Sequence, residues 1–155
     1  MNENAVVTSI NICSLKKHFQ DMQSSHKLTM SDVICVQETW IEPEQDNINQ
    51  FQISGFTAHF NSIGGKRGIT TYFTEKYSVV EDIKKTNYQI TKIASAETEI
   101  FNVYRSSNAS TMFVDDLMKL VNTEKKTHII GDFNLCHKSE RGNKMIKSLE
   151  QLGFR

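Results

Sequence analysis

The order of apolar and polar residues predicts strands and helices in turn along the first part of the chain. Residues 6–12 are β-branched and partly alternating, and apolar residues then recur at helical spacing from Leu15 to about residue 28. Residues 32–36 form a compact apolar run of the kind found in buried strands. This order predicts a strand, helix, strand unit.

Short strands are predicted through the middle of the chain, after a polar loop near residues 41–50. Turn residues separate five apolar runs, which occupy residues 55–60, 68–73, 78–83, 88–94 and 97–104. The middle of the chain is therefore expected to be rich in antiparallel β-structure.

Helical spacing returns after these strands. Apolar residues form one face from Ser110 to Val121, and a short strand is predicted at 127–130. A last helix carries Met145, Ile146, Leu149 and Leu152. Helices at both ends with antiparallel strands between them favour two packed mixed sheets flanked by helices over a doubly wound parallel sheet. The predicted fold class is α/β (α+β), a four-layered sandwich.

Length and composition place these elements in one domain, residues 1–155. The chain is 38% hydrophobic and 23% charged, which is ordinary for a globular protein with its own core. No apolar run reaches the length of a membrane-spanning helix, so we expect no membrane partner and an intracellular location, in the nucleus or cytoplasm. The cysteines Cys13, Cys35 and Cys136 are too far apart in sequence for a zinc motif and are expected to be reduced thiols.

Polar residues stand in or just after three of the predicted strands. Asn11 lies in the first, Glu38 follows the second, and Asp132 with Asn134 follows the strand at 127–130. Each alone has an ordinary structural explanation, as a turn residue, an exposed strand end or a partner for the local backbone. Together, carboxylates and carboxamides on rigid strand ends make the oxygen-rich, negatively charged site that Mg²⁺ prefers.

These residues fall in four segments whose order resembles the endonuclease/exonuclease/phosphatase family. The segments are residues 10–15, 34–40, 102–105 and 129–134. The most specific are Gln-Glu-Thr after one apolar strand and Gly-Asp-Phe-Asn after another. The Asn-x-x-Ser-Leu opening is similar to that of retrotransposon-type DNA endonucleases, which are related to AP endonucleases.

The resemblance implies roles for individual residues. Glu38, with Asn11 close by, would hold Mg²⁺, with Mn²⁺ as an alternative. Asp132 would orient or deprotonate the attacking water, Asn134 would contact the scissile phosphate, and Tyr104 would support the phosphate site. Hydrolysis of a phosphodiester concentrates negative charge on the phosphoryl oxygens, so a cation and a carboxylate that positions water fit this chemistry.

The partner implied by the resemblance is the phosphate backbone of DNA, and Asn11 would bind this phosphate together with Asn134. The formal net charge of zero supplies no overall field towards a polyanion. Arg105 is a candidate phosphate contact, while Lys66 and Arg67 sit in a glycine-rich turn. A basic stripe near the end of the chain is either a polyanion contact or a solvated helix face; it contains Lys138, Arg141, Lys144 and Lys147.

The sequence departs from the family after the Gly-Asp-Phe-Asn motif. Family members continue to an Asp-His pair, but the sequence contains no Asp-His dipeptide, and His137 follows Asn134 too closely to take that place. We therefore expect C-terminal strands of the fold to be missing, so that the chain is truncated. It would then be part of a longer polyprotein or need a strand-completing partner.

Three hypotheses about function follow. The first is a Mg²⁺-dependent phosphodiester hydrolase, a DNA endonuclease of mobile-element type. The second is a phosphatase or phosphodiesterase acting on a small molecule or RNA, because the same site serves many substrates. The third, motivated by the absent Asp-His pair, is a catalytically inactive remnant that at most binds DNA.

Overall fold

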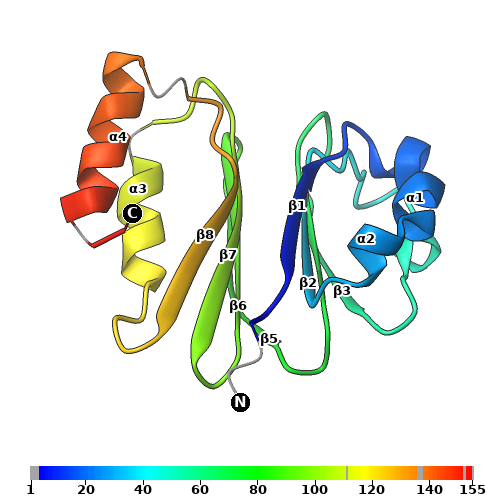
Figure 1. Ribbon diagram of the computed structural model, residues 1–155. Coiled ribbons are helices and arrows are strands. Elements are labelled where there is room, and N and C mark those ends of the chain that lie inside the picture. The colour runs from blue at the N-terminus through cyan, green and yellow to red at the C-terminus, as the bar shows by residue number, and fades with distance from the viewer. Residues whose placement is uncertain (1–3, 111, 136–137, 152, 155) are drawn as a thin grey trace.

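The computed structural model describes residues 4–110, 112–135, 138–151 and 153–154, and it has four layers (Figure 1). Two four-stranded sheets pack face to face in the described residues, and helices cover the outer face of each sheet. The predicted four-layered α/β sandwich of two mixed sheets is confirmed. Cys136, His137 and Leu152, which the sequence analysis named, lie outside the described residues.

The first sheet, sheet A, has the strand order β1-β2-β4-β3. Its strands are β1 (Val7–Asn11), β2 (Val33–Gln37), β3 (Thr57–Asn61) and β4 (Ile69–Phe73). Strands β1 and β2 are parallel, whereas β4 is antiparallel to both of its neighbours. A parallel pair needs a crossover, and α1 (Leu15–Ser24) with α2 (His26–Thr29) supplies it.

The second sheet, sheet B, has the strand order β5-β6-β7-β8. Its strands are β5 (Ser78–Lys84), β6 (Tyr88–Ala94), β7 (Thr98–Arg105) and β8 (Lys126–Asp132). The first three form an antiparallel meander, and β8 is parallel to β7 after the crossover helix α3 (Met112–Leu120). Helix α4 (Glu140–Gln151) lies beside α3 on the outer face of this sheet (Figure 1).

Alternation along the strands divides the apolar side chains among the layers. All of β2 is buried, and its successive residues point to opposite faces. Ile34 and Val36 therefore belong to the core under α1, while Val33 and Cys35 pack between the sheets. A third core lies between sheet B and the helices α3 and α4.

The structure corrects the predicted first helix. One helix was predicted over residues 15–28, but two helices meet at Ser25, whose backbone is extended at φ −75° and ψ 109°. The Ser25 side chain accepts a hydrogen bond from the amide of Leu28 and so caps the second helix. A 3₁₀ turn, η1 (Ile48–Phe51), lies inside the segment predicted as a polar loop and buries Phe51. No helix in the described ranges is long and apolar enough to cross a membrane.

The interface between the sheets becomes polar towards the carboxyl ends of β1, β2 and β8. The buried Gln37 donates from Nε2 to Asn102 Oδ1 at 2.9 Å. Asn102 in turn donates from Nδ2 to the Thr70 carbonyl at 3.1 Å and to Thr71 Oγ1 at 3.0 Å. These hydrogen bonds fix the position of one sheet relative to the other beneath the candidate site residues Asn11, Glu38 and Asp132.

Candidate active site

The carboxyl ends of β1, β2 and β8 bring three predicted site residues together. Strands β1 and β2 are parallel with Asn11 opposite Gln37, which places Glu38 just beyond Asn11. Strand β8 ends beside them, and Asn11 Nδ2 donates to Asp132 Oδ2 at 2.7 Å across 121 positions of sequence. The hydrogen bond joins sheet A to sheet B at the predicted site.

Glu38 is linked to the same group through Cys13, which the sequence analysis did not assign to the site. The Cys13 thiol donates to Glu38 Oε2 at 3.3 Å and lies 3.2 Å from Asn11 Oδ1. That oxygen also accepts from the Cys13 amide at 3.2 Å. The hydrogen bond to Glu38 is the main cause that raises the pKa of Cys13, with burial and the charges of Glu38 and Asp132 adding to it. Cys13 is therefore a neutral thiol at neutral pH.

Asn134 is held by the Asp132 carboxylate and by the Arg105 carbonyl. Its amide donates to Asp132 Oδ1 at 3.1 Å, and its Nδ2 donates to the Arg105 carbonyl at 2.8 Å. An Asn side-chain amide has a second N–H, so Asn134 retains a donor for a ligand. Asp132 thus accepts a hydrogen bond on each oxygen, from Asn11 on one side and Asn134 on the other.

Strained backbone is concentrated at these strand ends. Among the described residues other than glycine, those with positive φ are Cys13, Ser14, Glu38, Trp40 and Asn134, and each lies just after β1, β2 or β8. A residue with a β-carbon in the left-handed region costs on the order of 1–3 kcal/mol, and such residues persist where the surrounding structure over-determines them. The clustering is an observation independent of any motif, and it marks the same location as the candidate site.

Gly131 is explained by the close approach of β8 to β7. A β-carbon at this position would lie 1.9 Å from the Val103 carbonyl oxygen and 2.7 Å from its carbon. Val103 is the register partner of Gly131 in the parallel pair, so only glycine allows the strands to meet here. The glycine of Gly-Asp-Phe-Asn therefore positions Asp132.

Tyr104 lies near both carboxylates. It is opposite Asp132 in the register of β7 and β8 and is 6% exposed. Burial raises the pKa of Tyr104 most, the charges of Glu38 and Asp132 raise it further, and Arg67 opposes them. The phenol is therefore protonated at neutral pH and can act as a hydrogen-bond donor.

Arg105 takes a different position from Tyr104. The residue is 3% exposed, and its guanidinium donates to the carbonyls of Ser106, Ala109 and Phe133. These bonds tie the segment after β7 to the segment after β8. Phosphate binding by Arg105 stays a prediction.

The glycine-rich turn lies over the segment that follows Glu38. The Gly65 amide donates to Glu42 Oε1 at 2.8 Å, and the Trp40 amide donates to the Arg67 carbonyl at 3.0 Å. The Lys66 ammonium lies 5.3 Å from the centre of the Trp40 ring, a cation–π contact. This turn places two cations beside the candidate site.

The donor set fits a hard divalent cation. Glu38 and Asp132 are partly exposed carboxylates, and neither has an ion-pair partner within the described residues. The same residues contain no group of three or more His, Cys, Asp or Glu that would form a closed cage. Mg²⁺ is commonly held by one or two carboxylates with water and substrate phosphate, so an open set of this size suits it better than Zn²⁺.

The described histidines lie away from these carboxylates. His59 is 2.6 Å from Asp82 across the outer edges of the two sheets, and His18 lies on α1 near Asp21. His26 begins α2, and His128 is four residues before Asp132 in β8. Within the part of the chain that the structure describes, no histidine takes the place that the resemblance gives to the Asp-His pair.

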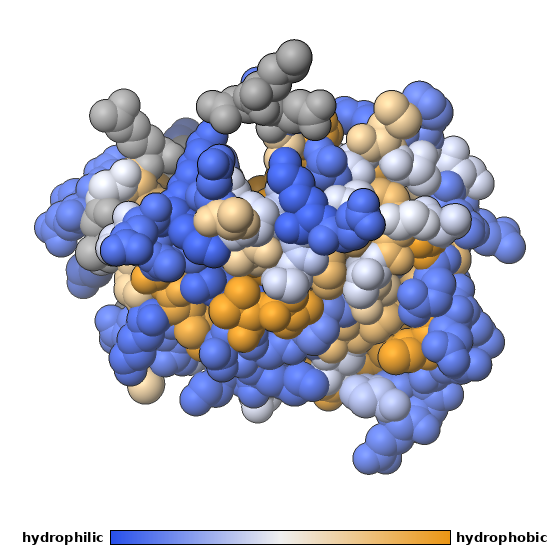
Figure 2. Space-filling model, turned by 90° about the horizontal axis from the view of Figure 1, so that it is seen from below, coloured by the Kyte–Doolittle hydropathy of each residue, from blue (hydrophilic) through white to orange (hydrophobic). Residues whose placement is uncertain are grey.

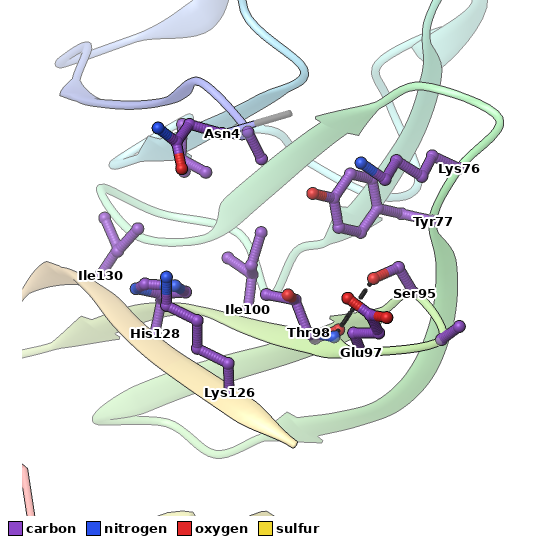
Figure 3. Close-up of a pocket in the computed structure, with 13 residues that line it drawn as sticks. Asn4, Lys76, Tyr77, Ser95, Glu97, Thr98, Ile100, Lys126, His128 and Ile130 are labelled. Atoms are coloured by element: carbon purple, nitrogen blue, oxygen red, sulfur yellow. Dashed lines mark hydrogen bonds between the residues drawn. The ribbon is translucent and has the colours of Figure 1, made fainter. Parts of the chain in front are cut away.

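A separate cavity lies at the other end of the sandwich. It has a volume of about 610 Å³ and lies between the starts of β1 and β8, where Tyr77, His128 and Lys126 line it (Figure 3). Lys126 is separated from Asp132 by the length of β8, about 20 Å. That end of the molecule shows apolar areas among hydrophilic side chains (Figure 2). The cavity is therefore separate from the candidate active site.

Comparison with known proteins identifies the fold. No family model matches the sequence, and no curated protein matches it either. Among solved structures, an AP endonuclease from Archaeoglobus fulgidus aligns with a TM-score of 0.75 at 17% identity, over 98% of this chain and 72% of that one. The 3′ phosphatase NExo from Neisseria, bound to a product DNA hairpin, aligns with a TM-score of 0.73 at 14% identity, over 97% and 72% of the two chains.

A retrotransposon enzyme is also similar. The endonuclease domain of TRAS1, a telomere-specific non-LTR retrotransposon, aligns with a TM-score of 0.68 at 13% identity, over 96% of this chain and 72% of that domain. These proteins share the endonuclease/exonuclease/phosphatase fold, and this chain has the same fold.

Proposed function

We propose that this chain, with the fold of DNA-cleaving and DNA-repair enzymes, is a divalent-metal-dependent phosphodiesterase that cleaves one strand of DNA. The observation that carries the proposal is the convergence of Asn11, Glu38 and Asp132 at the ends of three strands, with both carboxylates free of ion pairs in the described residues. DNA is proposed as the substrate because the similar structures include a phosphatase with a DNA product and a retrotransposon endonuclease.

Asp132 is the group that takes a proton from the attacking water. Each of its oxygens accepts one hydrogen bond, from Asn11 Nδ2 and from the Asn134 amide, which fixes the direction of the carboxylate. A carboxylate oxygen has two lone pairs, so one lone pair on each oxygen remains for water. As the water oxygen bonds to phosphorus, its proton moves to Asp132 and the leaving oxygen departs with the electron pair.

Asn134 and Tyr104 are the donors for the phosphate oxygens. Asn134 uses one Nδ2 hydrogen to bind the Arg105 carbonyl, which leaves the other directed by a fixed side chain. Tyr104 stays protonated because its pKa is raised, so it donates rather than repels an anion. Preorganised donors of this kind stabilise charge that develops in the transition state without reorganising.

Glu38 and Asn11 would hold the metal. Mg²⁺, or Mn²⁺ in its place, would supply Lewis-acid stabilisation of the phosphoryl charge when bound. Calorimetric titration of the protein with MgCl₂ should show a binding isotherm that disappears in Glu38→Gln and persists in Glu42→Gln. Identical isotherms for the two variants would remove Glu38 from the metal site.

The test of activity is nicking of supercoiled plasmid with MgCl₂ and with EDTA. Asp132→Asn keeps the shape of the side chain and removes its charge, so we expect nicking to fall by at least about 100-fold, the range for loss of a general base. Asp21→Asn, an exposed carboxylate on α1, is the matched control and should leave nicking unchanged. Nicking that survives Asp132→Asn or EDTA would contradict the proposed mechanism. Binding of DNA with no nicking would instead favour the inactive remnant.

A further inference from the structure

A second groove lies on the outer face of sheet B, next to the candidate active site. It has a volume of about 580 Å³ and runs between α3 and α4. Phe113 and Val114 of α3 and Met145 of α4 form an apolar side, and Arg105 and Arg141 are among its polar residues. The size is within the range of pockets that bind a small organic ligand or one unit of a polymer.

Arg105 is an unusual group to find in the wall of this groove. It is 3% exposed, and its partners are main-chain carbonyls rather than a carboxylate within the described residues. A buried cation without a counterion is destabilising, because desolvation is only partly offset by neutral acceptors. Burial lowers the pKa of Arg105, and the nearby charge of Arg141 lowers it further. A bound anion would supply the missing countercharge.

The charges around the groove favour an anion. Arg141 and Lys144 of α4 line it together with Arg105, and Asp115 is the acidic residue in the lining. Lys144 also pairs with Glu140 at 3.2 Å, but both side chains are largely exposed, so the pair contributes little. Arg141 has no ion-pair partner in the described residues.

The groove and the candidate active site are connected through Arg105. Adjacent residues of a strand point to opposite faces, so Tyr104 faces the carboxylates while Arg105 faces the helices. Asn134 Nδ2 donates to the Arg105 carbonyl, and the Arg105 side chain donates to the Phe133 carbonyl. The predicted phosphate donor and the basic groove therefore lie at the same end of β7 but on opposite faces of sheet B, so a nucleic-acid strand that occupies both passes over the ends of β7 and β8.

We propose that the groove between α3 and α4 is a second phosphate subsite, which binds a phosphate of the same DNA strand beyond the scissile one. Arg141 and Lys144 hold that phosphate, the buried Arg105 adds its charge from the wall of the groove, and Val114 and Met145 pack against the sugar. The inference rests on the proposed function for its substrate class. It assigns the basic residues of α4 unequal roles, because Lys147 is exposed on the same helix but does not line the groove.

The test compares two charge reversals on α4 by DNA binding. The probe is a short fluorescently labelled DNA duplex, bound by the full chain in EDTA so that no cleavage occurs, over a series of KCl concentrations. A phosphate contact contributes about 0.9 to the slope of log K against log salt. Arg141→Glu should lower the slope by about one and weaken binding about tenfold or more at low salt, whereas Lys147→Glu should change the slope by less than half as much. Arg141→Lys should restore most of the affinity.

Each outcome bears on the subsite separately from catalysis. Equal effects of Arg141→Glu and Lys147→Glu would mean that DNA is attracted by a diffuse positive field, which would overturn the subsite. No effect of Arg141→Glu on binding would overturn it as well. So would a wild-type protein that does not bind the duplex. A larger effect of Arg141→Glu on a matched RNA duplex than on DNA would overturn the assignment to DNA. A wild-type protein that binds with the expected slope but never nicks would leave the subsite standing and remove the proposed activity. Normal nicking by Arg141→Glu with unchanged affinity for DNA would remove the subsite and leave the proposed activity standing.

Discussion

Replacement of Gln37 by leucine tests whether the buried amides between the sheets stabilise the fold beneath the candidate site. Gln37 is 2% exposed, and its Nε2 lies 2.9 Å from Asn102 Oδ1, 3.1 Å from Ser9 Oγ and 3.2 Å from the Cys35 carbonyl. An amide nitrogen carries only two hydrogens, so at most two of these bonds form well at once. Leucine has a similar size but no donor.

The expected loss follows from the bonds removed. A hydrogen bond contributes about 1 kcal/mol net, and a buried acceptor left without a partner costs about 1–3 kcal/mol. Gln37→Leu removes up to two bonds and leaves Asn102 Oδ1 without its partner in a dry interface, so the free energy of unfolding should fall by about 2–4 kcal/mol. Asn102→Leu combined with Gln37→Leu should cost less than the sum of the two, with a coupling of about 0.5–3 kcal/mol.

Urea denaturation followed by the fluorescence of Trp40 measures both quantities. Gln52→Leu is the control, because Gln52 is exposed and its Nε2 donates weakly to the Ile48 carbonyl at 3.4 Å. That substitution should change stability by less than about 0.5 kcal/mol. If Gln37→Leu is no more destabilising than Gln52→Leu, or if the double variant is strictly additive, the buried amides do not hold the sheets together as argued.

Further predictions concern single positions. Gly131→Ala should lower the free energy of unfolding by about 3 kcal/mol or more, measured in urea. The added β-carbon would overlap the backbone carbonyl of Val103, which cannot move aside as a side chain can. Iodoacetamide should abolish nicking by the wild type but not by Cys13→Ser, because the exposed thiol lies against Glu38; the rate of inactivation should rise with pH, since the thiol pKa is raised. Burial and the bond to Asp116 raise the pKa of Tyr88 to about 12. Its stabilising contribution is therefore complete below the unfolded pKa near 10 and is lost as the pH rises towards 12, so Tyr88→Phe should show a smaller loss of stability in this window than the wild type.

Local patterns were sufficient for most of the elements, because these depend on short segments. Period-two and period-3.6 spacing located the strands and helices, and the polar positions at strand ends made Asn11, Glu38 and Asp132 candidate site residues. The structure places Asn11 and Asp132 in direct contact, which the motifs taken one by one did not specify. The break at Ser25 was missed because a serine within an apolar helical pattern is compatible with both a helix interior and a cap.

Long-range pairing was not contained in those patterns. Strand β4 lies between β2 and β3, an order that hydrophobic spacing does not specify. The roles of Gln37 and Asn102 depend on their meeting across the sheets, 65 positions apart. Arg105 was grouped with the phosphate contacts next to Tyr104, yet strand alternation turns the two side chains to opposite faces. A consistent use of period two within β7 would have found that separation.

The candidate site combines features that lower stability with a support that offsets them. Positive-φ residues after β1, β2 and β8 cost free energy in the folded state, and two carboxylates without ion pairs in the described residues lie at the same strand ends. Directly beneath them, the Gln37–Asn102 network and the close contact at Gly131 fix the strands that carry these groups. A fold selected for stability alone has no reason to place its strain and its unpaired charge at one point. Their coincidence at the meeting of both sheets supports the proposal that a ligand binds at this point, and the charge of the carboxylates favours a cation as that ligand.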